Sequence, residues 1–255
     1  MIDGPAPVLE REEILPGIVR LLLLSPGTAR SAVPGQFVQV EASPGAFPVT
    51  RRPFTINRRS ASEGTIEILF DVVGRGTELL ASSAPGDVLR LLGPLGSGYT
   101  LSEGRWLLVG GGMGAAGFPF LGESVEVRMT CVGAVSAEKL LPGCPGTVVK
   151  ATEDGSAGRR GLVTDLLRSV PWDEITDVAV CGSVPMMDAV WKKIPAGLRG
   201  AVQVSTESRM GCGWGVCEGC VIPSADGGYL KCCTEGPVFD ARRIDWAGWT
   251  GVSGT

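Results

Sequence analysis

The stretch "LLVGGGMGAAG", residues 107–117, joins an apolar run directly to a glycine-rich loop. An apolar run without alternating polar residues is typical of a strand that is buried on both faces of a parallel sheet. Glycines at the end of such a strand allow the phosphates of a dinucleotide to approach the backbone. The stretch therefore predicts an α/β domain that binds a nucleotide at the carboxyl ends of its strands.

Similar apolar runs continue through the second half of the chain. They occupy residues 105–110, 125–134, 146–152, 176–182 and 201–206. Apolar residues at helical spacing lie between some of them, in "GLVTDLLRSV" (161–170) and "PMMDAVWKKI" (185–194). The run "VAVCGSVPMM" (178–187) repeats the strand-to-glycine pattern. We therefore predict a doubly wound parallel sheet over residues 103–205, with a nucleotide pocket at its carboxyl edge.

Residues 1–102 follow a different pattern. Short apolar segments are broken by glycine turns, among them Pro34-Gly35, Pro44-Gly45 and Pro85-Gly86. No helical period separates these segments, and "TIEILF" (65–70) alternates as a half-buried strand does. The pattern predicts an antiparallel β-barrel of about six strands, so the fold class is mixed β and α/β. The strand segments are 17–25, 35–42, 51–58, 64–73 and 86–93.

Two segments of the predicted barrel carry groups that suit a flavin. "RRPFTINR" (51–58) places Arg52 and Thr55 on a strand, and "GRGTELL" (74–80) follows the next strand and opens a helix. A cationic fork and a hydroxyl beside the N–H groups of a helix start would suit a flavin and its pyrophosphate. The alternative is a solvated arginine and an ordinary glycine turn.

Five of the eight cysteines fall in the last fifth of the chain. In "GCGWGVCEGC" (211–220), Cys212, Cys217 and Cys220 have the spacing Cys-x4-Cys-x2-Cys, and Cys232 and Cys233 follow. Three ligands in one loop and a fourth further on is the plant-type arrangement for a 2Fe-2S cluster. A four-cysteine zinc site is the alternative, although it usually needs two Cys-x2-Cys pairs. Adjacent cysteines in an extended segment face opposite ways, so one of the last two is spare.

The composition narrows the chemistry further. The 255-residue chain has a formal charge of -4 and no histidine, which excludes Ser-His and Cys-His nucleophile pairs, imidazole acid/base catalysis and Rieske ligation. It has no block of basic residues for nucleic acid, no apolar run long enough to span a membrane, and no signal peptide in "MIDGPAPVLEREE". We therefore expect a cytoplasmic protein whose thiols stay reduced.

Taken together, these motifs resemble the ferredoxin-NADP reductase family. The resemblance lies in Arg-x-Phe-Thr at 52–55, the glycine-rich loop, and Cys-Gly-x-x-Pro-Met at 181–186. With the cysteine segment and the run "TEDGSAGRRGLVTDLL" (152–167), the chain is most similar to the electron-transfer subunits of class 1B dihydroorotate dehydrogenases over nearly its full length. Members of that family end the cluster segment with a cysteine, two residues and Gly-Pro-Val-Phe. Here this pattern is "CTEGPVF", which selects Cys233 as the fourth ligand.

The resemblance implies a set of binding residues. FAD would contact Arg52, Pro53, Phe54, Thr55, Leu69, Phe70, Asp71, Gly76 and Thr77. The nicotinamide dinucleotide would lie near Gly110, Gly111, Gly112, Gly114, Cys181 and Gly182. The cluster ligands would be Cys212, Cys217, Cys220 and Cys233, in a segment covering residues 206–255.

The sequence departs from the family pattern in two places. Asp71 stands where the family usually has a basic residue, so we expect only a backbone contact to FAD there. The segment after Gly114 leaves room for barely two helical turns before the strand expected at Val125, whereas the family has a full helix. A shortened helix would weaken the dipole at a nicotinamide phosphate. Arg159 and Arg160 would form a solvated turn, or would meet the extra phosphate of NADP.

The function implied by the resemblance is that of an oxidoreductase subunit, catalytic only with its partner, in pyrimidine biosynthesis. A partner subunit with FMN would oxidise dihydroorotate, and electrons would pass through the 2Fe-2S cluster and FAD to NAD+, in a heterotetramer of two subunits of each kind. The alternatives are a flavin and iron-sulfur subunit of another NAD(P)H- or ferredoxin-linked oxidoreductase or a hydrogenase, a stand-alone reductase, and a non-catalytic regulatory module that keeps only the cluster.

Overall fold

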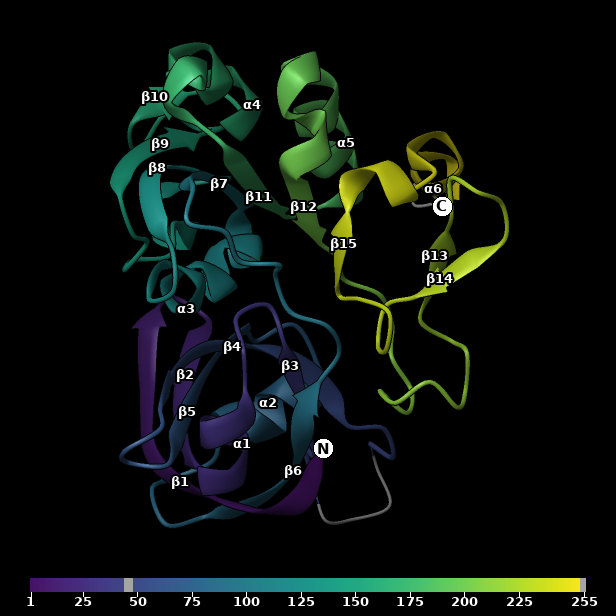
Figure 1. The fold of residues 1–255 in the computed structure, drawn as a ribbon. Helices are drawn as coiled ribbons and strands as arrows, with labels where there is room; N and C mark the ends of the chain where they lie inside the picture. The colour runs from purple at the N-terminus through teal and green to yellow at the C-terminus, as the bar shows by residue number, and fades with distance from the viewer. Residues whose placement is uncertain (44–47, 253–255) are drawn as a thin grey trace.

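A closed six-stranded antiparallel barrel forms the N-terminal part of the molecule, at the bottom of Figure 1. The computed structural model describes residues 1–43 and 48–252, and the turn predicted at Pro44-Gly45 lies outside them. Around the barrel the strands follow the order β1, β2, β5, β4, β3, β6. Their bounds are β1 (Ile2–Leu15), β2 (Ile18–Leu24), β3 (Phe37–Val40), β4 (Arg52–Ser60), β5 (Thr65–Asp71) and β6 (Val88–Leu95), with short helices α1 (Pro26–Ser31) and α2 (Arg75–Ala81).

The predicted barrel is confirmed, except that its first strand was not foreseen. The first seven residues of β1 contain Pro5 and Pro7, and its second half is mostly charged. Proline lacks a backbone N–H, so these residues are unusual inside a sheet. In the structure the strand bends between two neighbours: residues Ile2–Pro7 pair with β6, and the residues from Val8 onward pair with β2.

A seven-stranded sheet follows, at the upper left of Figure 1. Its order is β10, β9, β8, β7, β11, β12, β15, and all neighbours are parallel except β15, which is antiparallel to β12. The chain order reverses direction between β7 and β11, which makes the carboxyl ends of these two strands the switch point of the sheet. The bounds are β7 (Arg105–Gly111), β8 (Glu126–Ala134), β9 (Thr147–Thr152), β10 (Arg159–Arg160), β11 (Asp177–Cys181), β12 (Val202–Ser205) and β15 (Val238–Asp240).

The helices of this part are short. The predicted helical segments contain α4 (Val163–Leu166) and α5 (Val184–Lys193), on the face of the sheet seen at the top of Figure 1. After β7 the chain forms a 3₁₀ turn, η1 (Gly112–Gly117), and the five-residue helix α3 (Phe118–Gly122). The expectation of a shortened helix after Gly114 is therefore confirmed, and α3 instead packs its apolar side chains between the sheet and the barrel.

The C-terminal part is built on the edge of the sheet. After β12 the chain descends beside the barrel, forms the two-stranded ribbon β13 (Val221–Pro223) and β14 (Tyr229–Lys231), and returns as β15 before the last helix, α6 (Trp246–Val252) (Figure 1). Buried Cys220, Cys232 and Phe239 belong to the same hydrophobic core as Leu107 and Val178 of the sheet. The cysteine segment is thus packed into the molecule along one side.

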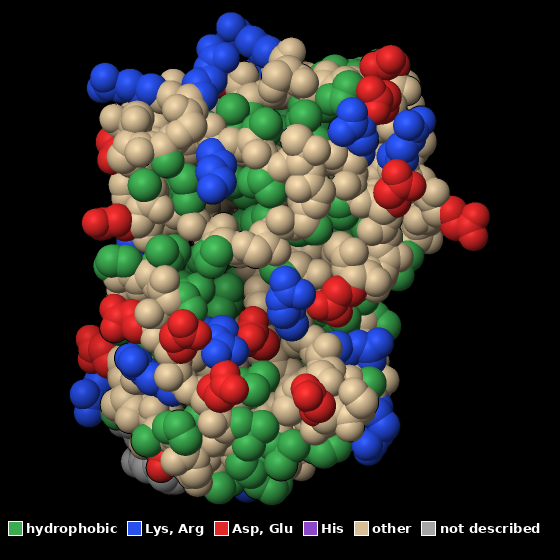
Figure 2. Space-filling view, turned by 90° about the vertical axis from the view of Figure 1, so that its left-hand side faces the viewer, with side chains coloured by type: hydrophobic (Ala, Val, Ile, Leu, Met, Phe, Trp, Pro, Cys, Tyr) green, Lys and Arg blue, Asp and Glu red, His purple; other side chains and the backbone are tan. Residues whose placement is uncertain are grey.

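Charged side chains of both signs cover the face that lies at the left of Figure 1. In the lower half of Figure 2, over the barrel, acidic and basic side chains alternate. The barrel carries an ion-pair network of Arg20 with Glu10, Glu12 and Glu67, at 2.6, 3.1 and 2.9 Å. Basic side chains stand out at the upper end of Figure 2, the end where β10 lies in Figure 1. Within residues 1–43 and 48–252, no helix is long and apolar enough to cross a membrane.

Candidate functional site

Two cavities lie where the barrel meets the sheet, and one of them also borders the C-terminal segment. The first, which we call the barrel cavity, has a volume of about 320 Å³. Strands β4 and β5 form one side of it, and the residues that lead from β12 into the cysteine loop form the other. It is lined by Phe37, Arg52, Pro53, Phe54, Thr55, Leu69, Phe70, Asp71, Val73, Thr77, Met113, Ala116, Thr206, Glu207, Ser208, Met210 and Pro237.

Eight of the nine residues predicted to contact FAD line the barrel cavity. The ninth, Gly76, lies directly behind Arg52: a Cβ atom there would stand 2.5 Å from the Arg52 Nε. Arg52 is fixed by donating from Nη1 to the carbonyl and hydroxyl oxygens of Thr50, at 2.5 and 2.8 Å. The Thr77 hydroxyl accepts from the N–H of Val73 at 2.9 Å and closes the turn between β5 and α2. A largely apolar cavity with aromatic walls, one guanidinium and several hydroxyls fits a flavin, and the Asp71 and Glu207 carboxyls complete its lining.

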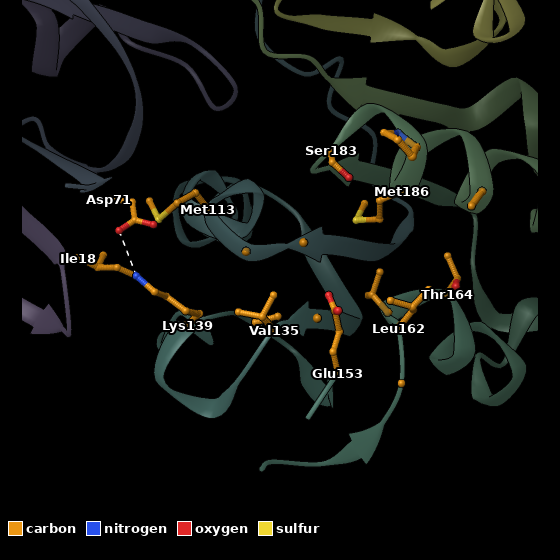
Figure 3. A pocket seen from close by; sticks show the side chains of 18 residues that line it. Ile18, Asp71, Met113, Val135, Lys139, Glu153, Leu162, Thr164, Ser183 and Met186 are labelled. Atoms are coloured by element: carbon orange, nitrogen blue, oxygen red, sulfur yellow. Dashed lines mark hydrogen bonds and ion pairs between the residues drawn. The ribbon is translucent and has the colours of Figure 1, made fainter. Parts of the chain in front are cut away.

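The second cavity, which we call the sheet cavity, opens at the carboxyl ends of the parallel strands and has a volume of about 540 Å³ (Figure 3). Its walls come from the ends of β7, β8, β9 and β11 and the start of α5, as expected for a nucleotide site at the switch point. It is lined by Ile18, Asp71, Gly111, Gly112, Met113, Gly133, Ala134, Val135, Lys139, Glu153, Gly161, Leu162, Val163, Thr164, Ser183, Pro185, Met186 and Ala189.

The two glycine loops predicted to bind the nicotinamide pack against each other at the sheet cavity. Gly111 and Gly112 line it, and Gly114 lies behind them, where a Cβ atom would stand 2.3 Å from the Cys181 carbonyl oxygen. A Cβ atom on Gly182 would meet Met186. The close approach of two backbones therefore requires glycine at position 114, whereas a Cβ atom on Gly111 or Gly182 would meet the Met186 side chain and one on Gly112 would meet open space.

Neither Gly110 nor Cys181 lines the sheet cavity. A Cβ atom on Gly110 would stand 2.7 Å from Phe118, in the interior behind the loop. The Cys181 side chain is 7% exposed, and desolvation, with the nearby Glu207 carboxyl, raises its pKa. Cys181 is therefore a neutral thiol at neutral pH. The exposed Arg159 and Arg160 are not among the cavity's lining residues either.

The two cavities share a wall. Asp71 and Met113 line both of them, and Figure 3 shows the two side chains together at one end of the sheet cavity. The Asp71 carboxylate, expected to offer only its backbone, is paired with Lys139 at 3.1 Å. The barrel and the glycine turn also touch directly, because the buried Asn57 side chain donates to the Ala116 carbonyl at 2.5 Å. The cavities are therefore neighbouring compartments of one site.

The cysteine loop wraps its backbone around Cys212. The N–H groups of Trp214 and Cys217 each donate to the Cys212 sulfur at 3.4 Å. Desolvation raises the pKa of this thiol, but the donated N–H bonds outweigh it and lower the pKa to about 6. Positive φ angles at Gly213 and Gly215 let the loop turn tightly, and a Cβ atom on Gly211 would stand 3.2 Å from the Cys217 sulfur. A thiolate ringed by N–H donors suits a ligand of an iron-sulfur cluster.

The two candidates for the fourth ligand have different surroundings. Cys232 is completely buried, and its sulfur lies 3.4 Å from the Thr206 hydroxyl; burial raises its pKa to about 11. Cys233 interacts with the Cys220 thiol and with the N–H of Gly215, and desolvation together with Cys220 raises its pKa to about 12. Cys233 is thus the member of the pair whose thiol interacts with the cysteine loop backbone, whereas Cys232 contacts that backbone only through its own N–H, which donates to the Cys220 carbonyl at 3.0 Å. Among the described residues, no three cysteine or acidic side chains are grouped closely enough to hold a metal ion.

Sequence reasoning missed one part of the site. The segment from Thr206 to Met210 was assigned to the cluster region, yet four of its side chains line the barrel cavity. Met113 was passed over as a residue between glycines, although it contributes to both cavities. One indication was available in the sequence. Met210 is an apolar residue only two positions before the first ligand cysteine, which is consistent with a buried segment leading into the cysteine loop.

Comparison with known proteins places these observations in a family. The model of the iron-sulfur cluster binding domain of dihydroorotate dehydrogenase B matches residues 207–245. The dihydroorotate dehydrogenase B (NAD(+)) electron transfer subunit of Desulforamulus reducens is 36% identical, over 94% of this chain and 97% of that protein. The corresponding subunit of Geobacillus kaustophilus is 37% identical, over 83% of this chain and 86% of that protein.

Solved structures support the fold. The structure of a NADH-dependent reduced ferredoxin-NADP oxidoreductase, described for flavin-based electron bifurcation, has a TM-score of 0.85 and 25% identity, covering 96% of this chain and 91% of that chain. A ferredoxin NADP+ reductase from Neisseria gonorrhoeae, solved with bound FAD and NADP, has a TM-score of 0.62 and 16% identity, covering 79% of this chain and 97% of that one. The second likeness concerns the fold alone.

Proposed function

Because the chain belongs to the family of electron-transfer subunits of NAD-dependent dihydroorotate dehydrogenase B, we propose that it carries electrons from a dihydroorotate-oxidising partner subunit to NAD+. A 2Fe-2S cluster exchanges single electrons, a nicotinamide takes up a hydride, and FAD supplies the chemistry that connects the two. The partner would carry FMN and assemble as two copies of each subunit. We propose a cytoplasmic location, because free ligand cysteines need a reducing compartment.

One observation carries this proposal: the wall of the barrel cavity continues into the cysteine loop. Thr206, Glu207 and Ser208 line the cavity, Met210 follows, and Cys212 begins the loop two residues later. On the return path, Pro237 lines the same cavity just after Cys233. Electron transfer requires short distances, and this arrangement holds the cluster segment against the flavin cavity.

The barrel holds the flavin in this proposal. Arg52 and Thr55 would meet the polar groups of FAD, and Phe54, Phe70 and Leu69 would contact its rings through the apolar wall. Pro53, Asp71, Gly76 and Thr77 would shape the cavity through the backbone. The barrel corresponds to residues 1–102, which we propose as the FAD-binding domain.

The sheet holds the nicotinamide in this proposal. The loops at Gly110–Gly114 and Cys181–Gly182 would admit it to the sheet cavity, and Met113 and Asp71 stand between this cavity and the flavin. Hydride transfer between a flavin ring and a nicotinamide ring at this wall would require correct positioning more than acid/base catalysis by side chains. A chain without histidine can therefore support it. We propose residues 103–205 as the NAD-binding domain.

The cluster would be held by Cys212, Cys217, Cys220 and Cys233, in a segment of residues 206–255. This segment exposes apolar side chains: Trp214 is 45% exposed, Val216 74% and Tyr229 72%. Contiguous exposed apolar side chains mark protein interfaces, and Trp214 and Val216 lie close together on the cysteine loop. They support docking of the catalytic subunit at the cysteine loop.

The test is reconstitution. We expect the chain purified without oxygen to contain FAD, iron and sulfide, and to reduce NAD+ with dihydroorotate only when the FMN subunit of a dihydroorotate dehydrogenase B is added. Each subunit alone serves as the control. A colourless zinc protein, or a cofactor-loaded pair that leaves NAD+ oxidised, would contradict the proposal.

A further inference from the structure

A buried glutamine of the barrel lies against the cysteine loop. Gln39, on β3, is completely buried, and neither its Nε2 nor its Oε1 has a hydrogen-bond partner among the described residues. Its neighbours Val38 and Val40 are buried in the barrel core. Buried side-chain amides nearly always have partners, so an amide with none among the described residues calls for a partner that is not a residue of the chain.

The cysteine loop passes directly over this amide. A Cβ atom on Gly213 would stand 2.8 Å from both Cγ and Nε2 of Gln39, and Gly213 has a φ of 85°. Gly213 follows Cys212, the thiol that already receives the N–H groups of Trp214 and Cys217. The loop backbone is therefore pressed against the glutamine, yet it makes no hydrogen bond with it.

We propose that the Gln39 side-chain amide donates a hydrogen bond to the sulfur shell of the 2Fe-2S cluster bound at Cys212, and thereby raises the reduction potential of the cluster. This inference rests on the proposed function, because it requires the cluster to be present. Hydrogen bonds to cluster sulfurs stabilise the reduced state, which carries the more negative charge. Gln39 would thus act on the cluster directly, from strand β3 of the barrel.

The other two glutamines of the chain provide controls. Gln36 is engaged with the Gly96 carbonyl and the Val33 N–H, at 2.7 and 3.0 Å. Gln203 accepts from the Thr100 N–H and donates to the Thr100 carbonyl, at 2.8 and 2.9 Å. Gln203→Met therefore removes an amide of the same kind that is fully paired and lies on the sheet.

The experiment is an EPR-monitored redox titration of the complete chain and its variants. At the wild-type midpoint potential we expect Gln39→Met to lower the ratio of reduced to oxidised cluster about tenfold, which is 59 mV for a one-electron couple. Gln203→Met should leave the ratio unchanged. An unchanged ratio in Gln39→Met, or the same decrease in both variants, would overturn the inference. Wild-type protein without any cluster would instead overturn the proposed function.

A second measurement needs no variant that might fail to assemble its cluster. In wild-type protein labelled with ¹⁵N only in glutamine side chains, pulsed EPR of the reduced cluster should detect a coupled ¹⁵N nucleus. Because Gln36 and Gln203 are paired elsewhere, this signal belongs to Gln39. If the reduced cluster of the labelled protein shows no ¹⁵N coupling, the proposed hydrogen bond is refuted.

Discussion

Lys139 reaches from the sheet to the barrel, where its Nζ lies 3.1 Å from the Asp71 Oδ1 and 3.1 Å from the Pro16 carbonyl oxygen (Figure 3). Asp71 ends β5, and Lys139 lies in the loop after β8, so the contact joins the two parts of the chain at the wall that both cavities share. The ion pair therefore balances the charge of the Asp71 carboxylate in the shared wall.

We expect Lys139→Met to weaken NAD+ binding about threefold, because the uncompensated Asp71 carboxylate would repel the phosphates of the dinucleotide. Both side chains are about a third exposed, so the free energy of unfolding should fall by less than about 1 kcal/mol. Titration of NAD+ into the FAD-loaded protein measures the effect. Asp71→Asn in the same chain should restore the affinity, and Arg58→Met, which breaks the 2.9 Å contact of Arg58 with Glu123, should not change it.

The ligand assignment can be tested by separate serine substitutions at the two adjacent cysteines. Cys233→Ser should lose the cluster absorption and the EPR signal of the reduced cluster. Cys232→Ser should keep both, because Cys232 faces Thr206 in the core, and should lose only about 1–2 kcal/mol of stability from burying a hydroxyl. Loss of the cluster in the Cys232 variant alone would show that the assignment is wrong.

Two glycines at the start of α2 differ in the space around them. A Cβ atom on Gly76 would collide with the Arg52 guanidinium, whereas a Cβ atom on Gly74 would meet nothing within 4 Å. We therefore expect Gly76→Ala to displace Arg52 and to weaken FAD binding roughly tenfold, equivalent to about 1.4 kcal/mol. Gly74→Ala, whose φ is close to 180°, is the matched control and should retain FAD. Equal retention in the two variants would contradict a role of Arg52 in flavin binding.

The contact between the two glycine loops makes a prediction for stability. Gly114→Ala would press a methyl group against the Cys181 carbonyl and the Gly182 N–H, which are backbone atoms that cannot rotate away. Overpacking of this kind costs about 1–3 kcal/mol, and chemical denaturation should detect it. Gly197→Ala, in an open 3₁₀ turn, should change stability by less than about 0.5 kcal/mol. An unchanged free energy of unfolding in the Gly114→Ala variant would mean that the two glycine loops can move apart.

The charges that line the sheet cavity lead us to expect a preference for NAD+ over NADP+. Among its described lining residues the one cation is Lys139, which is already paired with Asp71, while Glu153 adds a carboxylate at the end of β9. An additional phosphate would therefore meet negative charge. We expect kcat/KM for NAD+ to exceed that for NADP+ at least tenfold, about 1.4 kcal/mol, and Glu153→Gln to narrow the ratio. Leu162→Gln, a polar change elsewhere on the cavity wall, is the control and should leave the ratio unchanged.

The fold could largely be predicted because the strands of the barrel and those of the parallel sheet have different sequence patterns. Buried parallel strands such as Val178–Cys181 are unbroken apolar runs. Barrel strands lie between glycine turns, and apolar and polar residues alternate along them. Strand β1 could not be found in this way, since Pro5, Pro7 and its charged residues obey no strand pattern, and its pairing depends on the closure of the barrel. The return of β15 beside β12 is also a long-range pairing, of which the residues Val238–Asp240 give no local sign.

The site residues that belong to local sequence motifs could be predicted. Arg52–Thr55 and Gly111–Gly112 lie on cavity walls because glycines and an arginine at strand ends have a recognisable pattern. Lys139 and Gln39 could not be assigned, because each acquires its role from a segment far away in the sequence. A lysine in a loop and a glutamine in an apolar strand have no meaning until Asp71 and Gly213 are placed beside them.

The antiparallel pairing of Ser205 with Val238 gives the cysteine segment an unusual mechanical setting. The segment departs from and returns to the same point of the sheet edge, so its two ends are clamped together whether or not iron is bound. The conformational entropy of closing this loop is therefore lost when the sheet folds, and not when the metal arrives. Oxidative loss of the cluster would then disorder only the middle of the cysteine segment, between its two paired ends. The seven-stranded sheet would remain folded and would keep the cysteine segment in place for a new cluster.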